Sequence, residues 1–201
     1  MTPPTTFGLR ADLAAIAQVV KSRSRVLDVG CGNGDLMEAL EMHKMCEARG
    51  IEIAPELVEK CVARGLSVVQ SNADRDLANY PDKAFDYTIL SQTLQTADRP
   101  DQMLDEMLRV GKRAIISFPN FAHWRTRTAL FFGGRMPVTR ALPVSWYETR
   151  NIHHVTVEDF LTLAKNKRAR IERAWYFADD APISRLVANW RAEYAMFELS
   201  R

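Results

Sequence analysis

The sequence lacks any long hydrophobic run. Nowhere in its 201 residues do about 18 apolar residues follow one another without a charge, as a membrane-spanning helix requires. Residues 1–8 have neither the basic start nor the apolar core of a secretory signal. No membrane span or secretory leader is indicated, and we expect a cytoplasmic protein.

Cysteine is also scarce. The chain has three, Cys31, Cys46 and Cys61, an odd number with no C-x-x-C spacing. A disulfide framework needs paired cysteines, and a structural zinc site needs closely spaced ligands. We therefore expect ordinary reduced thiols and no metal site.

The overall charge is small, but the charged residues are unevenly distributed. Residues 1–120 carry 14 Lys and Arg against 17 Asp and Glu, whereas residues 121–201 carry 13 against 8. No long basic run, zinc-finger spacing or aromatic-basic RNA motif is present, so a nucleic-acid partner is not expected. The basic C-terminal part suits an anionic substrate, an acidic protein surface or simply a solvated positive face.

The pattern of apolar residues alternates between strand-like and helix-like segments. The length favours one domain over residues 1–201. Short apolar strands between helices indicate a mostly parallel sheet covered on both faces, with ligands at the carboxyl ends of the strands. We expect helices at 10–21, after 34, at 56–64, 101–110 and 156–164, and strands at 25–30, 46–53, 66–70, 85–90, 113–118 and 168–177, with a final edge strand at 193–199.

The alternation stops between residues 119 and 154. This segment is rich in Pro, Gly, Arg and aromatic residues. It follows the fifth strand at the edge where such sheets bind ligands. We expect an insert that covers the site or presents a docking surface.

A glycine-rich turn follows the first strand. Asp28 ends an apolar run and is followed by Gly30, Cys31, Gly32, Asn33 and Gly34 before a helical pattern begins. Glycines in this context let the backbone turn tightly and approach a ligand closely, whereas glycines needed only for packing would be the plain alternative. The D-x-G-x-G-x-G spacing resembles the loop that binds S-adenosylmethionine (SAM) in class I methyltransferases. The resemblance implies a doubly wound, Rossmann-like, mostly parallel sheet of seven strands.

Acidic residues after the next two strands complete the candidate nucleotide site. Glu52, followed by Ile53, ends the second strand, where a carboxylate can accept hydrogen bonds from the two hydroxyls of a ribose. Glu56 is the other candidate for the ribose ligand. It lies at a helix start, where a favourable interaction with the helix dipole accounts for an acidic residue without any ligand. In the segment Asn72-Ala73-Asp74, Asp74 matches the methyltransferase position that accepts from the adenine amino group, or else it caps a turn.

No catalytic residue can be assigned. Ser91 and Gln92 leave the fourth strand where the reactive methyl group is expected. Many similar small-molecule methyltransferases place a histidine a few residues later, where this chain has Gln95 and Thr96. The remaining candidate bases are His123, Tyr147, His153 and His154 on the insert, and none is singled out by its spacing.

Phrases on and near the insert narrow the resemblance. They are Leu90-Ser-Gln-Thr-Leu-Gln95, Ser117-Phe-Pro-Asn-Phe-Ala-His-Trp-Arg125, Gly134-Arg-Met-Pro-Val138, Leu142-Pro143, Trp146-Tyr147 and Asn151-Ile-His153. Together they resemble the methionine biosynthesis family MetW over about residues 9–178. The resemblance implies a protein that binds SAM or S-adenosylhomocysteine (SAH) and works with the homoserine O-acyltransferase MetX.

Two functions of different class therefore stand. One is a regulatory partner of the acyltransferase, and the other is a methyltransferase acting on a small molecule. The missing histidine favours the partner, as does the frequency of Trp and Arg at interface hot spots. Candidate contacts, which a packed lid would also explain, are Trp124, Arg125, Arg135, Trp146 and Tyr147.

Overall fold

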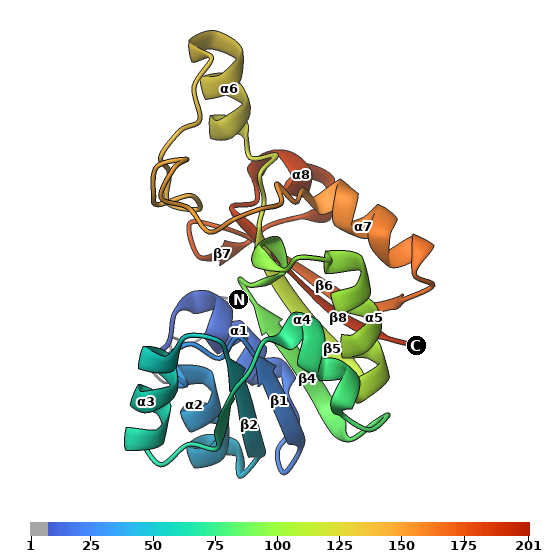
Figure 1. Ribbon diagram of the computed structural model, residues 1–201. Helices are drawn as coiled ribbons and strands as arrows, with labels where there is room; N and C mark the ends of the chain where they lie inside the picture. The colour runs from blue at the N-terminus through green and yellow to red at the C-terminus, as the bar shows by residue number, and fades with distance from the viewer. Residues whose placement is uncertain (1–7) are drawn as a thin grey trace.

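A mixed sheet of eight strands forms the centre of the molecule in the computed structural model, which describes residues 8–201 (Figure 1). The strand order is β3-β2-β1-β4-β5-β8-β6-β7. The strands are β1 (Arg25–Val29), β2 (Glu47–Glu52), β3 (Val68–Gln70), β4 (Phe85–Ser91), β5 (Gly111–Pro119), β6 (Arg170–Ala178), β7 (Ala181–Pro182) and β8 (Tyr194–Ser200). Strands β1 to β5 are parallel, which confirms the mostly parallel α/β fold.

The C-terminal strand differs from the expectation. Instead of lying at an edge, β8 is inserted between β5 and β6 and pairs antiparallel with both. The edge is formed by the two-residue strand β7, which adds an eighth strand to the expected seven. Ala195, Met196 and Phe197 in β8 are fully buried, as an interior strand requires.

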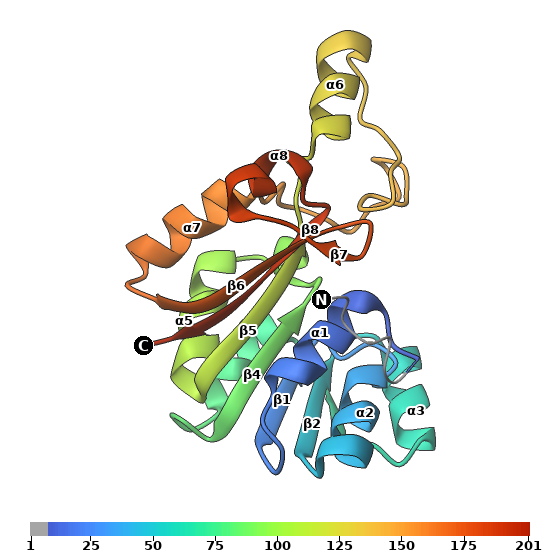
Figure 2. The same ribbon diagram turned by 180° about the vertical axis from the view of Figure 1, so that it is seen from behind.

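Helices cover both faces of the sheet. The main ones are α1 (Ala11–Val19), α2 (Asp35–Lys44), α3 (Pro55–Ala63), α5 (Pro100–Val110), α6 (Trp124–Gly133) and α7 (Val157–Asn166); the short ones are α4 (Ala73–Asp76), η1 (Leu77–Asn79), η2 (Leu94–Thr96), η3 (Arg185–Val187) and α8 (Ala188–Arg191). Helices α5 and α7 cover the face that is in front in Figure 1, whereas α1 is in front when the molecule is seen from behind (Figure 2).

Alternating strand residues divide the core between the two faces. In β1, Val26 packs with the α1 and α2 side, whereas Leu27 and Val29 pack with the α5 and α7 side. Successive strand side chains point to opposite faces, so a strand buried on both sides is apolar throughout. This explains why the strands read as short continuous hydrophobic runs.

The segment between β5 and α7 stands above the carboxyl edge of the sheet. Helix α6 projects from the rest of the molecule, and the segment after it returns over the sheet (Figure 1). The sequence had not predicted this helix. Thr126 is the buried residue of α6, so the helix has no one-sided apolar stripe that periodicity would detect.

None of the helices formed by residues 8–201 has the length and hydropathy needed to cross a bilayer. The expectation about a secretory leader concerns residues 1–8, of which 1–7 lie outside the described residues. In the described part of the chain, no group of three or more His, Cys, Asp or Glu side chains is arranged to hold a metal ion.

Candidate functional site

The glycine loop joins β1 to α2 at the carboxyl edge of the sheet. Gly30, Gly32 and Gly34 have φ values of +73°, +59° and +80°, a left-handed conformation that side chains with a Cβ disfavour. A Cβ on Gly30 would lie 2.9 Å from Thr93 Oγ1, and one on Gly34 would lie 2.4 Å from Leu66 Cδ1. A Cβ on Gly32 would meet no atom within 4 Å. Two glycines thus permit packing, and the middle one borders open space where a ligand can approach.

Glu52 connects this loop to the end of β2. Its Oε2 accepts a hydrogen bond from the Gly32 N–H at 2.9 Å, and its Oε1 accepts from the N–H groups of Ile53 and Ala54 at 2.9 and 3.0 Å. A carboxylate has about four acceptor positions, so one remains for a ligand hydroxyl. The two-hydroxyl ribose contact expected from the sequence would require the Gly32 N–H to release Oε2. Glu56 is exposed in the first turn of α3, where its favourable interaction with the helix dipole accounts for an acidic residue.

Asp28 is buried beneath the loop, with 3% of its surface exposed. Burial, followed by repulsion from the nearby Glu52 carboxylate, raises the pKa of Asp28 from 3.8 to about 7. The residue is therefore close to its titration point near neutral pH. Sequence inspection identified the acid but not its environment.

The remaining loop residues are held by side chains from α3. Cys61 Sγ donates to the Gly32 carbonyl at 3.3 Å, and burial raises the pKa of both Cys31 and Cys61, so they are protonated thiols. Arg64 donates to the Asn33 carbonyl and binds Asp35 at 2.7 Å. Sequence inspection missed Arg64 because Asn33 and Asp35 lie 31 and 29 residues earlier in the chain.

The segment predicted to face the adenine lies after β3, beside Glu52. The Ser71 N–H donates to the Glu52 carbonyl at 3.0 Å, which ties the two strand ends together. Asn72 caps α4 by accepting from the Asp74 N–H at 3.0 Å, with Ala73 opening the helix. The exposed Asp74 is thus not the cap, and its carboxylate accepts from the Asp98 N–H at 3.3 Å.

Ser91 and Gln92 lie at the end of β4, next to β1 in the sheet. Ser91 Oγ donates to Asp12 at 3.3 Å and lies 3.2 Å from Ser117 Oγ. Gln92 has a φ of +53°, and its N–H donates to the Ser117 carbonyl at 2.9 Å. The strand order therefore brings all the predicted nucleotide residues to one edge. It also adds Asp12 from α1, which no nearby sequence motif marked.

The candidate bases have different environments. His123 caps α6 by accepting from the Arg125 N–H at 3.3 Å, and burial lowers its pKa, so it is a neutral structural residue. His154 packs edge-on against Phe121, with ring centroids 4.7 Å apart. His153 has a buried Nε2 without a partner among the described residues. Tyr147 is exposed.

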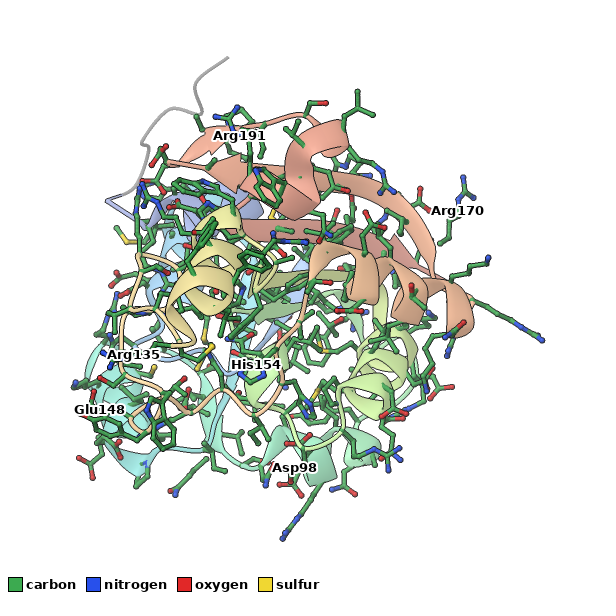
Figure 3. The ribbon with its side chains drawn as sticks, turned by 90° about the horizontal axis from the view of Figure 1, so that it is seen from above. Asp98, Arg135, Glu148, His154, Arg170 and Arg191 are labelled. Atoms are coloured by element: carbon green, nitrogen blue, oxygen red, sulfur yellow. The ribbon has the colours of Figure 1, made fainter. Side chains whose placement is uncertain are left out.

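The insert carries the predicted docking residues at its surface. Trp124 is stacked under the Arg125 guanidinium at 5.4 Å, and Trp146 contacts Tyr147 with ring centroids 5.7 Å apart. Arg135 is exposed and lies at the rim of the molecule (Figure 3). Sequence inspection missed Phe131 and Phe132 on α6, which are 83% and 82% exposed. Two adjacent phenylalanines in a segment without apolar periodicity are the sequence signal that could have identified them.

Comparisons with known proteins identify relatives of this chain. A bifunctional methionine biosynthesis protein MetXA/MetW of Rhodopirellula baltica is 36% identical over 165 residues, which are 78% of this chain and 26% of that protein. A ubiquinone biosynthesis O-methyltransferase of Xylella fastidiosa is 31% identical over 144 residues, covering 67% of this chain and 56% of the relative. The chain thus spans between about a quarter and just over half of these relatives.

Solved structures show the same fold. A SAM-dependent methyltransferase from Archaeoglobus fulgidus aligns with a TM-score of 0.71 and 18% identity, covering 97% of this chain and 96% of that one. The fold is therefore the Rossmann-like fold of class I methyltransferases. The family model described as methionine biosynthesis protein MetW matches residues 10–199. The chain belongs to the MetW family.

Proposed function

We propose that the chain binds SAM or SAH at the carboxyl ends of β1 to β4. The residues that would hold it are Asp28, Gly30, Cys31, Gly32, Asn33, Gly34, Glu52, Ile53, Asn72, Ala73, Asp74, Ser91 and Gln92. The support is the open space beside Gly32, the free acceptor position on Glu52 and the exposed Asp74 carboxylate. These features suit a nucleoside with ribose hydroxyls and an adenine amino group.

Calorimetric titration with SAH tests this site. Gly32→Val places a branched side chain in the open space, and Glu52→Ala removes the acceptor that holds the loop, so both variants should lose binding. Glu56→Ala is the matched control because Glu56 is exposed outside the loop. Unchanged affinity in both site variants would contradict the assignment.

We further propose that the protein acts as an accessory subunit of a homoserine O-acyltransferase of the MetX type. The observation that carries this is the relative named MetXA/MetW, of which this chain spans 26%. Joining two activities in one chain gives each a high effective concentration of the other, as a functional complex does. The fusion thus supports association of the separate chains.

The docking surface of this proposal is the projecting part of the insert. It comprises Trp124, Arg125, Phe131, Phe132, Arg135, Trp146 and Tyr147. Exposed aromatic side chains with adjacent arginines are typical of interface hot spots, and α6 leaves its two phenylalanines without contacts to the sheet core. The arginines suit an acidic patch on the partner.

Enzyme rates test the partnership. The homoserine acylation rate of purified MetX should change when this chain is added and should respond to SAM or SAH. The double change Phe131→Ala and Phe132→Ala should weaken binding at least tenfold, and Trp124→Ala or Arg135→Ala should do the same. Leu186→Ala is the matched control, because Leu186 is 95% exposed on η3, outside the insert.

A chain without effect on MetX under any of these conditions would favour the second candidate, a small-molecule methyltransferase. The identity with an O-methyltransferase supports that candidate. SAM would supply a methyl group on sulfonium for transfer to a nucleophile. The fold is compatible with an acyltransferase subunit and with a methyltransferase, so the homoserine acylation rates decide between the two functions.

A further inference from the structure

A cleft of about 660 Å³ lies between the sheet and the insert. Its floor consists of Gln92 and Gln95 after β4, Pro119 at the end of β5 and Phe121 just after it. Its roof comes from the segment after α6 and is mostly apolar. The roof residues are Met136, Pro137, Ala141, Leu142, Pro143, Val144, Trp146, Glu148, Thr149, Arg150, Asn151 and His154. This volume is in the range of small-molecule sites, which are roughly 300–1,000 Å³.

The roof is anchored at both ends. Arg140 forms an ion pair with Asp180 and lies 3.9 Å from Glu193, next to β8. At the other end, the N–H groups of Ile152 and His153 donate to the Gln95 carbonyl at 2.9 and 3.0 Å. Viewed from above, His154 lies over the middle of the molecule and Glu148 at its rim (Figure 3). These contacts hold the roof over the floor of the cleft.

One polar group in the floor lacks a partner. Gln95 is 4% exposed, and its Nε2 donates to the Gln92 carbonyl at 2.7 Å, which fixes the orientation of the amide. Its Oε1 is buried without a hydrogen-bond partner among the described residues. A buried acceptor left unpaired costs about 1–3 kcal/mol. Gln95 lines the cleft, so a ligand gains affinity if its binding turns the Gln95 amide oxygen toward a donor group.

We propose that this cleft is a second ligand site, separate from the nucleotide site, for a small molecule with an apolar ring body and a hydroxyl or amino group. The ring body matches the Pro, Leu, Phe and Trp lining, and the donor group matches Gln95 Oε1. Gln92 belongs to both sites, so the donor end of the ligand lies toward the nucleotide site. This inference does not require the acyltransferase partnership, and Trp146 is the residue that the cleft shares with the proposed docking surface.

Paired probes test both features of the ligand. The purified chain is titrated by calorimetry with 2-naphthol, which has a hydroxyl donor, and with 2-methoxynaphthalene, which has the same rings and no donor. We expect 2-naphthol to bind about tenfold more tightly, the effect of one hydrogen bond of about 1.4 kcal/mol. Gln95→Leu should remove this preference while both probes still bind.

Filling the cleft tests its position. Ala141→Trp places an indole among the lining residues and should abolish binding of both probes, whereas Ala78→Trp adds the same side chain at an exposed position on η1. Circular dichroism and SAH titration check that each variant is folded. The proposal is overturned if neither probe binds the wild type, if Ala141→Trp binds as the wild type does, or if Gln95→Leu keeps the preference.

Discussion

At the scale of the residue, replacing two glycines of the same loop is expected to lower the stability of the protein by different amounts. Gly34→Ala combines an unfavourable φ with a Cβ 2.4 Å from Leu66 and 3.0 Å from Cys61, both buried side chains. Its free energy of unfolding should fall by about 2–4 kcal/mol. Gly32→Ala meets open space and should lose only about 1–2 kcal/mol from its φ. Urea unfolding of both variants measures the difference, and equal losses would contradict it.

The Asp28 carboxyl makes stability depend on pH. Its pKa is about 7 in the folded protein and 3.8 without the fold, so the native state binds the proton more tightly between these values. Stability from this group therefore falls as pH rises from about 4 to 7, by up to about 4 kcal/mol. Asp28→Asn removes this dependence. We expect the Tm of the variant relative to wild type to increase from pH 5 to pH 8, and a constant difference would show that Asp28 does not titrate there.

The limits of sequence inspection at this scale follow from distance along the chain. The spacing of Gly30, Gly32 and Gly34 is local, so their special conformations could be predicted. The roles of Asp12 and Arg64 depend on contacts across the sheet edge and between α3 and the loop. Those contacts exist only after the strands have been ordered, and no residue pattern near either side chain encodes them.

At the scale of the element, α6 is expected to be the least protected of the longer helices. It has 10 residues, a length at which isolated helices are marginal in water, and Thr126 is its buried residue. Helix α5 buries Met103, Leu104 and Leu108 against the sheet. Hydrogen exchange followed by mass spectrometry should show fast exchange in 124–133 and slow exchange in 103–110. Equal protection in the isolated chain would show that α6 is packed.

Adding MetX should slow exchange in the same helix if the docking surface is placed correctly. Burial of Phe131 and Phe132 would order the helix and shield its amides. The exchange of α5, which is already in the core, should not change. Protection confined to other segments would move the interface away from α6.

Periodicity predicts elements that pack and misses those that do not. Strands β1, β2, β4, β5, β6 and β8 and helices α2, α5 and α7 have buried residues, and their positions could be predicted from apolar spacing. The exposed two-residue strand β7 was not predicted. Helix α6 escaped because its aromatic residues face outward. The strand at the C-terminus was predicted, but its predicted place at an edge was wrong. It lies between β5 and β6, because strand order is set by pairing and not by hydrophobic pattern.

At the scale of the whole molecule, the order of strands joins the two ends of the chain in one sheet. Strand β8 pairs with β5 on one side and with β6 on the other, so the C-terminal third cannot separate from the central strands without breaking the β5–β8 ladder. We propose on this basis that the chain folds as one domain. A single domain predicts that unfolding is cooperative throughout the sheet.

Removal of β8 tests this cooperativity. Deleting residues 194–201 removes Met196, Phe197 and Leu199, all fully buried, and exposes both neighbouring strands. Buried side chains of this size contribute about 2–5 kcal/mol each, so their sum matches the roughly 5–15 kcal/mol of a typical domain. The truncated chain should lack a cooperative thermal transition. Deleting Arg201 alone removes a surface ion pair with Asp105 and should cost less than about 1 kcal/mol. A cooperative transition in the longer deletion would mean that the parallel strands form a unit that is stable without β8.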